Sequence, residues 1–410
     1  MPTMRGNNLP KVKQQNEESI KALLYRFGPM SRAEMAERLE LTPPTITNIV
    51  GELIGAGILR ELPPDESAVN AHSVGRKPIL VDFIAEARLS LGISLGRDRT
   101  HWCITDLRGR ILQKGCEPIM PDRYDDMLPR LLALVQRIRA EYPAEWARLF
   151  GLGLVMPGVV DPHGGVLRNN GSERVDWCDM ALAKAVSEAA GLPVRMENNV
   201  RGRTCAVTLF HPQLVADCPT FAFCHVSWGI ACPIVLRSSS YCGEDYAAGE
   251  IGHMIVVPDG PAMKDCGQPG SLEALSSTRA ILARCRQALA GDTPTMLRAL
   301  CPDPAQLTLE QVLMVQAQGD AFVCGLLRES LRYLGIALSN ITAFLRPARI
   351  VIGGPLFRYA PNVDYLRLSM RESSFLSAEH DPQLVVLDLG EYGGAIGGAA
   401  VCLEKFFLRG

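Results

Sequence analysis

A chain of 410 residues is longer than one ordinary domain, so we expect two or three domains. With 47% hydrophobic and 21% charged residues it can bury large cores, which excludes a disordered protein. A net charge of −2 excludes a surface coated with cations for nucleic acid, and the first 80 residues hold 10 Lys and Arg against 9 Asp and Glu. Any DNA binding must then depend on a few well-placed cations and on two copies in an oligomer.

The 13 cysteines are scattered without a Cys-x-x-Cys pair, which is typical of a reducing cytoplasm. No charged and then apolar leader opens the chain, so no signal peptide is predicted. The longest mostly apolar stretch, 221–236, is interrupted by His225 and Ser227 and is too short to span a bilayer. We therefore expect a cytoplasmic protein with no membrane partner.

Three short amphipathic helices are predicted after a loose polar segment, residues 1–15. Apolar residues recur at helical spacing between Ile20 and Phe27, and Gly28-Pro29 ends that helix. Ser31 and Glu34 have the spacing of a capping box before the second helix, and Thr42 can cap the third. Three such helices with a tight second connection are typical of a helix-turn-helix.

The third predicted helix begins with polar residues. In a helix-turn-helix, side chains at this position of the helix contact the edges of the bases. Two strands are predicted after it, at 58–61 and 78–81, as a wing whose loop ends in two adjacent cations suited to phosphates or a narrow minor groove. A helical bundle that binds another protein would show the same helical spacing. The candidate DNA-binding residues are Ser31, Arg32, Thr42, Pro44, Thr45, Thr47, Asn48, Arg76 and Lys77.

Two motifs favour DNA binding by resemblance. Ser31-Arg32-Ala33-Glu34-Met35-Ala36 and Leu41-Thr42-Pro43-Pro44-Thr45-Ile46-Thr47 are similar to the second-helix and recognition-helix motifs of the ROK family (repressor, open reading frame, kinase). The resemblance implies a winged helix-turn-helix over residues 1–86. Its partner would be operator double-stranded DNA, bound by a homodimer or homotetramer.

The rest of the chain resembles the body of the ROK sugar kinases. Strands are predicted at 89–95, 101–106 and from 111, followed by a helix at 124–140 and a buried strand at 151–155. This order resembles the two-lobed actin-like ATPase (ribonuclease H-like) fold, so the fold class is α/β. The resemblance implies a domain over 87–410, with a smaller lobe of about 87–198 plus a C-terminal helix at 393–408, and a larger lobe of about 199–392. The glycines of 393–398 are expected to permit close helix packing.

Three motifs that carry kinase chemistry are altered. Where the kinases have Asp-x-Gly-Gly-Thr, the chain has Ser94-Leu95-Gly96-Arg97-Asp98, and where they have Gly-Thr-Gly-Ile-Gly it has Ser227-Trp228-Gly229-Ile230-Ala231. Phosphoryl transfer depends on positioning and charge neutralisation, and both phosphate loops have lost features that serve them. The family's catalytic aspartate is replaced by Asn199, and an amide cannot act as the base. We therefore expect no enzyme activity and no cofactor; the alternative is an active ROK carbohydrate kinase with a regulatory DNA-binding head.

The sugar-facing motifs of the family are retained as Gly249-Glu250-Ile251-Gly252-His253 and Leu272-Glu273. Carboxylate, imidazole and amide groups suit a ligand whose hydroxyls both donate and accept hydrogen bonds. The alternative for Glu250 and His253 is that they satisfy a buried loop. The candidate ligand-binding residues are Asn198, Asn199, Glu250, His253 and Glu273.

The structural zinc site of the family is degenerate. Its Cys-x-Cys-Gly-x-x-Gly-Cys motif reads Lys264-Asp265-Cys266-Gly267-Gln268-Pro269-Gly270-Ser271. His253 and Cys266 alone fall short of the four ligands of a structural zinc, so we expect no tightly bound metal, although Cys242 could substitute for a lost ligand. The sequence thus predicts a DNA-binding regulator, a repressor of carbohydrate-related genes, whose inactive body senses a sugar or sugar derivative. A regulator that binds another protein instead of a sugar is a further alternative.

Overall fold

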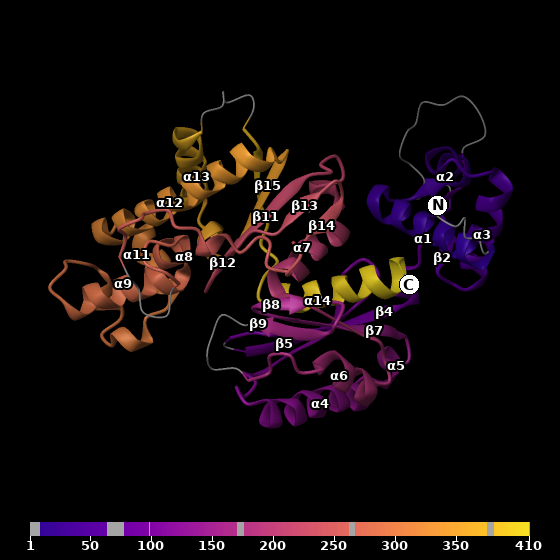
Figure 1. The fold of residues 1–410 in the computed structure, drawn as a ribbon, viewed down its shortest axis with the longest axis horizontal. Helices are drawn as coiled ribbons and strands as arrows, with labels where there is room; N and C mark the ends of the chain where they lie inside the picture. Colours follow the sequence, from indigo (N-terminus) through magenta and orange to yellow (C-terminus); the bar gives the residue numbers. More distant parts are fainter. Residues whose placement is uncertain are drawn as a thin grey trace, which may run out of the picture. The chain divides into compact units, whose positions relative to one another are not determined.

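The computed structural model describes residues 9–63, 78–97, 99–169, 176–261, 267–374 and 381–409 (Figure 1). The chain forms two compact units, the first made of 1–216 with 391–410 and the second of 217–390. The first unit contains the head, a five-stranded sheet and the C-terminal helix. The lobe boundary that we placed after residue 198 stays a prediction, and the helix that follows it belongs to the first unit.

The head has the elements of a winged helix-turn-helix. Its helices are α1 (Leu9–Phe27), α2 (Arg32–Leu39) and α3 (Pro43–Gly55). Strands β1 (Met30–Ser31), β2 (Leu59–Glu61) and β3 (Leu80–Phe83) form an antiparallel sheet in the order β1-β3-β2. The expectation of a loose segment was wrong for residues 9–15, because α1 begins at Leu9, and residues 1–8 lie outside the described residues. Polar pairs one turn apart support this first half of α1, with Gln14 donating to Glu18 (3.0 Å) and Lys21 pairing with Glu17 (2.5 Å).

Side-chain caps begin two of the head's helices. The backbone N–H of Glu34 donates to Ser31 Oγ (3.2 Å), and that of Thr45 donates to Thr42 Oγ1 (3.4 Å). The predicted capping box is half formed. The Glu34 carboxylate accepts from Arg38, one turn along α2, instead of returning to the Ser31 backbone.

The first unit's sheet has the order β10-β7-β4-β5-β6. Its strands are β4 (Leu89–Leu95), β5 (Arg99–Thr105), β6 (Ile111–Pro118), β7 (Leu149–Met156) and β10 (Val194–Asn198), and β8 (Val159–Asp161) pairs with β9 (Val166–Asn169) in a separate hairpin. Strands β4, β7 and β10 are parallel, so their carboxyl ends meet at one edge. The strands of this sheet whose bounds were predicted, and helix α4, begin and end within two residues of the predicted positions.

Helices cover both faces of this sheet (Figure 1). On one face lie α4 (Tyr124–Glu141) and α6 (Leu182–Ala190), with the short α5 (Pro143–Trp146) between them in sequence. On the other lie α7 (Asn199–Phe210) and α14 (Gly393–Leu403). Apolar side chains of α4 and α6, such as Leu131 and Val186, form one buried cluster with those of the strands.

Glycines allow α14 to lie against the backbone of its neighbours. A Cβ at Gly92 would be 1.9 Å from Ala395 O, and one at Gly153 would be 1.8 Å from Gly398 O. A Cβ at Gly397 would be 2.6 Å from the carbonyl carbon of Gly202 in α7. No side chain fits at these distances, so the expectation that the C-terminal glycines serve close helix packing is confirmed.

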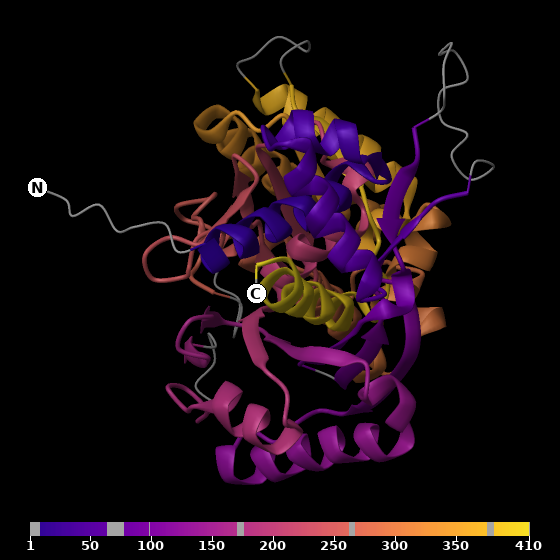
Figure 2. The same cartoon turned by 90° about the vertical axis from the view of Figure 1, so that its right-hand side faces the viewer.

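The head lies beside the carboxyl end of α14 (Figure 2), and the two share a hydrophobic core. Phe407, in the π-helical turn Glu404–Leu408, is buried in the same cluster as Met35 and Phe83 of the head. The Lys21 ammonium donates to Phe407 O (3.1 Å), and the buried Tyr25 hydroxyl donates to Leu107 O. The described part of the head is therefore packed on the body rather than joined only through a linker.

The second unit has the strand order β14-β13-β11-β15-β16, with β12 paired to β11. Its strands are β11 (Phe221–Val226), β12 (Ile230–Ala231), β13 (Ile234–Leu236), β14 (Ser239–Tyr241), β15 (Arg349–Gly353) and β16 (Gln383–Val386). Its helices are α8 (Leu272–Ser276), α9 (Thr278–Ala290), α10 (Leu297–Leu300), α11 (Leu309–Ala317), α12 (Ala321–Leu345) and α13 (Ala360–Ser373). Across both units, no helix within the described ranges combines the length and hydropathy needed to cross a bilayer.

Candidate DNA-binding face and ligand-binding residues

The amino-terminal turns of α3 present a polar face to solvent. Pro44, Thr47 and Asn48 are exposed, as is the capping residue Thr42, whereas the apolar stripe of α3 is buried in the head. Thr45 is half-buried, with its hydroxyl 2.8 Å from that of Thr42. This face has the character that base-edge recognition requires, because its hydroxyl and amide groups can donate and accept hydrogen bonds.

The remaining predicted DNA-binding residues differ in accessibility. Ser31 is buried and caps α2, so its first role is structural. The Arg32 guanidinium lies 2.8 Å from the Glu61 carboxylate of β2, with both side chains partly exposed. Contact between Arg32 and a phosphate would therefore compete with this ion pair. Arg76 and Lys77, at the predicted wing tip, lie outside the described residues.

Asn198 holds the start of α7 at the carboxyl edge of the sheet. Its Oδ1 accepts from the backbone N–H groups of Val200 (2.8 Å) and Arg201 (3.1 Å), and its Nδ2 donates to Gly158 O (2.8 Å). The side chain is buried, and three of its four hydrogen-bonding positions are occupied. Its capping role was missed from the sequence, although Asn before a helix is a recognised N-cap signal.

Asn199, the first residue of α7, is half-buried. Within the described residues, its side-chain amide makes no hydrogen bond. It therefore keeps both donor and acceptor groups for a ligand, in contrast to Asn198.

Two arginines of α7 were not recognised from the sequence as site residues. Arg201 is buried, and its Nε donates to the buried carboxylate of Glu197 (2.7 Å). Arg203 Nη1 donates to Asn199 O (3.2 Å), and burial lowers the pKa of its guanidinium to about 10. Both side chains lie at the end of α7 where Asn199 begins the helix.

In the second unit, Glu273 at the start of α8 is held by two partners. Its Oε1 accepts from Arg279 Nη2 (2.8 Å), and its Oε2 is 3.4 Å from the donating N–H of Ile230. The Glu273 and Arg279 side chains are only 16% and 17% exposed. A Cβ at Gly229 would be 2.8 Å from Oε2, so the glycine leaves room for this carboxylate. Glu273 is thus held in place by contacts with other groups of the protein.

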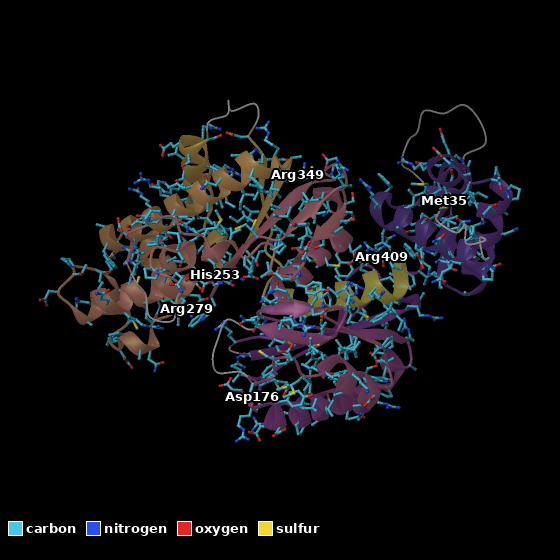
Figure 3. All side chains as sticks on the ribbon, viewed as in Figure 1. Met35, Asp176, His253, Arg279, Arg349 and Arg409 are labelled. Carbon is cyan, nitrogen blue, oxygen red and sulfur yellow. The ribbon has the colours of Figure 1, made fainter. Side chains whose placement is uncertain are left out.

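Glu250 and His253 flank a short turn that packs against Glu273. Glu250 is half-buried and His253 is exposed at the end of the 3-10 turn Ile251–His253. A Cβ at Gly252, between them, would be 3.1 Å from the Glu273 carboxylate. Figure 3 labels His253 and Arg279, both in the second unit. Two motifs that are separate in sequence therefore meet here, and their role in binding a ligand stays a prediction.

The described residues offer one group of potential metal ligands, which is not the family's zinc site. His101, Cys116 and Glu391 place their ligand atoms within 4.8 Å of one another, and Nε2 of His101 is 3.1 Å from Glu391 Oε1. The Arg99 guanidinium lies 3.6 Å from the Cys116 sulfur and would repel a bound cation. Cys266 of the degenerate zinc motif lies outside the described residues.

The model of the ROK family matches residues 90–405. The chain belongs to the ROK family. A crystal structure of a ROK family transcriptional regulator, a homologue of the Escherichia coli Mlc protein, has 26% sequence identity and a TM-score of 0.82, with 97% of this chain and 98% of that one covered. The xylose repressor of Bacillus subtilis (strain 168) is 23% identical over 399 residues, 96% of each protein.

The body of this ROK protein also matches a kinase. A ROK family glucokinase from Streptomyces griseus, solved with glucose and AMPPNP, has 23% identity and a TM-score of 0.65, covering 77% of this chain and 100% of the kinase. This likeness concerns the fold alone. The predicted α/β fold class, a winged helix-turn-helix joined to a two-lobed actin-like body, is confirmed.

Proposed function

We propose that this ROK protein is a DNA-binding transcriptional regulator, a repressor of carbohydrate-related genes, whose body binds a sugar or sugar derivative. The observation that carries the proposal is the exposed polar face of α3 in a winged helix-turn-helix packed on a kinase-like body. The names of its relatives, a xylose repressor and a ROK transcriptional regulator, support the same reading.

The body is proposed to bind without catalysing phosphoryl transfer. Asn199 stands at the position of the family's catalytic base and supplies an amide, which accepts no proton near neutral pH. Trp228, 36% exposed, stands in the second phosphate loop, where the kinases need a small residue, and its ring lies 5.7 Å from the Arg279 guanidinium. The bulky ring of Trp228 and the replacement of the catalytic base by an amide both oppose phosphoryl transfer.

Recognition of an operator requires two heads. The head is nearly neutral, so one copy has few cations to offer to phosphates. We propose a homodimer or homotetramer that places two α3 helices in successive major grooves, about 34–36 Å apart. The operator would then contain two related half-sites.

The contacts of α14 provide a physical link through which ligand binding in the body would affect the head. At its amino end, Gly394 lies against Ser94 and Arg203, beside Asn199. At its carboxyl end, Leu403 and then Phe407 of the following π-helical turn pack in the core of the head. A ligand that contacts Asn199 and changes the packing of α14 would shift the head between two positions, provided that it binds one state more tightly.

The experiment is selection of fragments from the source genome with the full-length protein, followed by footprinting with and without a panel of sugars. We expect a protected site with two half-sites, and at least one sugar that changes its protection. The absence of a protected site under all conditions would refute DNA binding. A protected site that no sugar alters would refute sugar sensing and favour a protein partner.

A further inference from the structure

Three potential metal ligands from separate segments of the first unit lie close together. His101 of β5 and Cys116 of β6 are direct partners across the antiparallel strands, so both side chains point to the same face of the sheet. Glu391 stands two residues before α14. The three ligand atoms lie within 4.8 Å of one another, and Nε2 of His101 is 3.1 Å from Oε1 of Glu391. They belong neither to the proposed DNA-binding face nor to the predicted ligand-binding residues.

The fold itself positions two of these ligands. His101 and Cys116 are half-buried, and the pairing of β5 with β6 holds their backbones next to each other. The imidazole lies edge-on against the Tyr392 ring, with ring centroids 5.1 Å apart and an angle of 76° between the planes. A ring that is already oriented loses little conformational freedom when it binds an ion. Glu391, whose side chain is 65% exposed, has room to rotate toward the ion.

The mixture of ligand types selects the kind of ion. Imidazole nitrogen, thiolate sulfur and carboxylate oxygen are all common zinc ligands, whereas Mg²⁺ and Ca²⁺ prefer sites made of oxygen atoms alone. In a tetrahedral zinc site with bonds of about 2.0–2.3 Å, the ligand atoms lie about 3.3–3.8 Å from one another. Separations of up to 4.8 Å exceed this by at most about 1 Å, which rotation of the side chains can supply.

The charges of the site permit a doubly charged ion, although two cations lie nearby. A thiolate and a carboxylate together cancel the two charges of Zn²⁺, so the complex is neutral. The Arg99 guanidinium lies 3.6 Å from the Cys116 sulfur. The Lys114 ammonium lies 4.8 Å from the centroid of the Tyr392 ring. Both cationic side chains are exposed, so water weakens their repulsion of the ion.

We propose that His101, Cys116 and Glu391 bind a zinc ion, with water as the fourth ligand. Three protein ligands and one water leave a coordination position open, so the ion is held less tightly than by four protein ligands. The ion joins the edge strand β6 and its neighbour β5 to the segment that begins α14. This binding is independent of the proposed recognition of DNA and sugar, and it goes beyond that function.

Cobalt titration of the full-length protein tests the proposal, because Co²⁺ occupies zinc sites and, unlike Zn²⁺, has a visible spectrum. The untagged protein is stripped of metal with a chelator, kept reduced and titrated with Co²⁺. We expect one ion per chain, with the visible bands of tetrahedral Co²⁺ and a near-ultraviolet thiolate-to-cobalt band. Added Zn²⁺ should remove these bands, since it binds such ligands more tightly than Co²⁺. A titration without these bands would overturn the proposal.

Variants show whether the ion lies at this site. Cys116→Ser should abolish the thiolate-to-cobalt band, and Glu391→Gln should weaken Zn²⁺ binding about tenfold or more in competition with a chelating dye. Cys324→Ser, which removes another half-buried thiol in α12, is the matched control and should leave the spectrum unchanged. A thiolate band that survives Cys116→Ser would place the metal on other cysteines and overturn the proposal.

Thermal unfolding with and without Zn²⁺ separates metal binding from a structural role of the same residues. Glu391 is at an exposed position, so the metal-free Tm of Glu391→Gln should stay close to that of the wild type. Zn²⁺ stabilises the folded protein to which it binds, so the wild type should unfold at a higher temperature than the variant only when Zn²⁺ is present. A Tm difference that is the same with and without Zn²⁺ would overturn the proposal.

Discussion

Two neighbouring asparagines at the carboxyl edge of the first unit's sheet differ in how many of their hydrogen-bonding groups are already used. Asn198 uses most of its capacity to begin α7, whereas the Asn199 amide bonds to no described residue. Both residues were predicted to bind a ligand because a sequence motif shows that a side chain is an amide. The motif does not show which of the amide atoms already make hydrogen bonds within the protein.

Restoring the carboxylate at position 199 should not restore a kinase. Asn199→Asp returns a base, but Trp228 still occupies the second phosphate loop, and Ser94 and Arg97 still alter the first. We predict no sugar-dependent ATP consumption by the variant in a coupled assay over a sugar panel. Turnover approaching ~1 s⁻¹, the lower end of ordinary kinase rates, would show that the phosphate loops are functional.

Asp161 should make stability depend on pH at the acid end. Hydrogen bonds from the backbone N–H of Gly164, together with those from Arg168 and His163, lower the pKa of this carboxyl to about 2. Because the folded pKa lies below the ordinary value, the stabilisation is complete above about pH 5 and is lost as the pH falls through about 2. Asp161→Asn should therefore lower the Tm at pH 7, with a difference from the wild type that shrinks below pH ~4. A constant difference down to pH ~2 would contradict this pKa.

At the scale of elements, local signals were the predictable ones. The caps at Ser31 and Thr42 and the apolar stripe of α3 follow from neighbouring residues, and the structure confirms them. The packing of Phe407 into the head joins residues that are hundreds of positions apart in the sequence. The spacing of neighbouring residues therefore could not predict it. The early start of α1 was missed because its first half is stabilised by polar pairs rather than an apolar stripe.

The glycine contact between α14 and α7 should be intolerant of a methyl group. A Cβ at Gly397 would be 2.6 Å from Gly202 C and 2.7 Å from Arg203 N, so the helices must separate. We predict that Gly397→Ala destabilises the protein by about 1–3 kcal/mol in denaturant unfolding. Gly325→Ala, in α12 with nothing within 4 Å of its Cβ, is the control and should gain about 0.5–1 kcal/mol. Equal effects of the two changes would refute tight packing at Gly397.

The contact between α14 and the head should be necessary for the sugar response. Phe407 lies 5.8 Å from Phe83 and 5.6 Å from Phe150 between ring centroids. Phe407→Ala should cost about 3–5 kcal/mol of unfolding free energy and weaken the effect of sugar on operator binding, measured by fluorescence anisotropy. Phe344→Ala, at an 87% exposed position, should change stability by no more than about 0.5 kcal/mol. An unchanged sugar response in Phe407→Ala would remove α14 from the coupling.

At the scale of the whole molecule, the family and the α/β class could be predicted because several separated motifs agree on one fold. The arrangement of the wing tip could not be tested, because Arg76 and Lys77 lie outside the described residues. The identity of the ligand also does not follow from fold, since a fold hosts many ligands and only the site selects one. Regulation by a sugar therefore has to be measured as a coupling between two sites.

Reciprocal titration measures that coupling most directly. The dissociation constant of the effector sugar is determined by calorimetry with the full-length protein, first alone and then saturated with operator DNA. We predict that operator changes the sugar affinity by the same factor, about 5 to 150, by which saturating sugar changes the operator affinity. A sugar affinity that stays the same with and without bound operator would show that the body does not control the head.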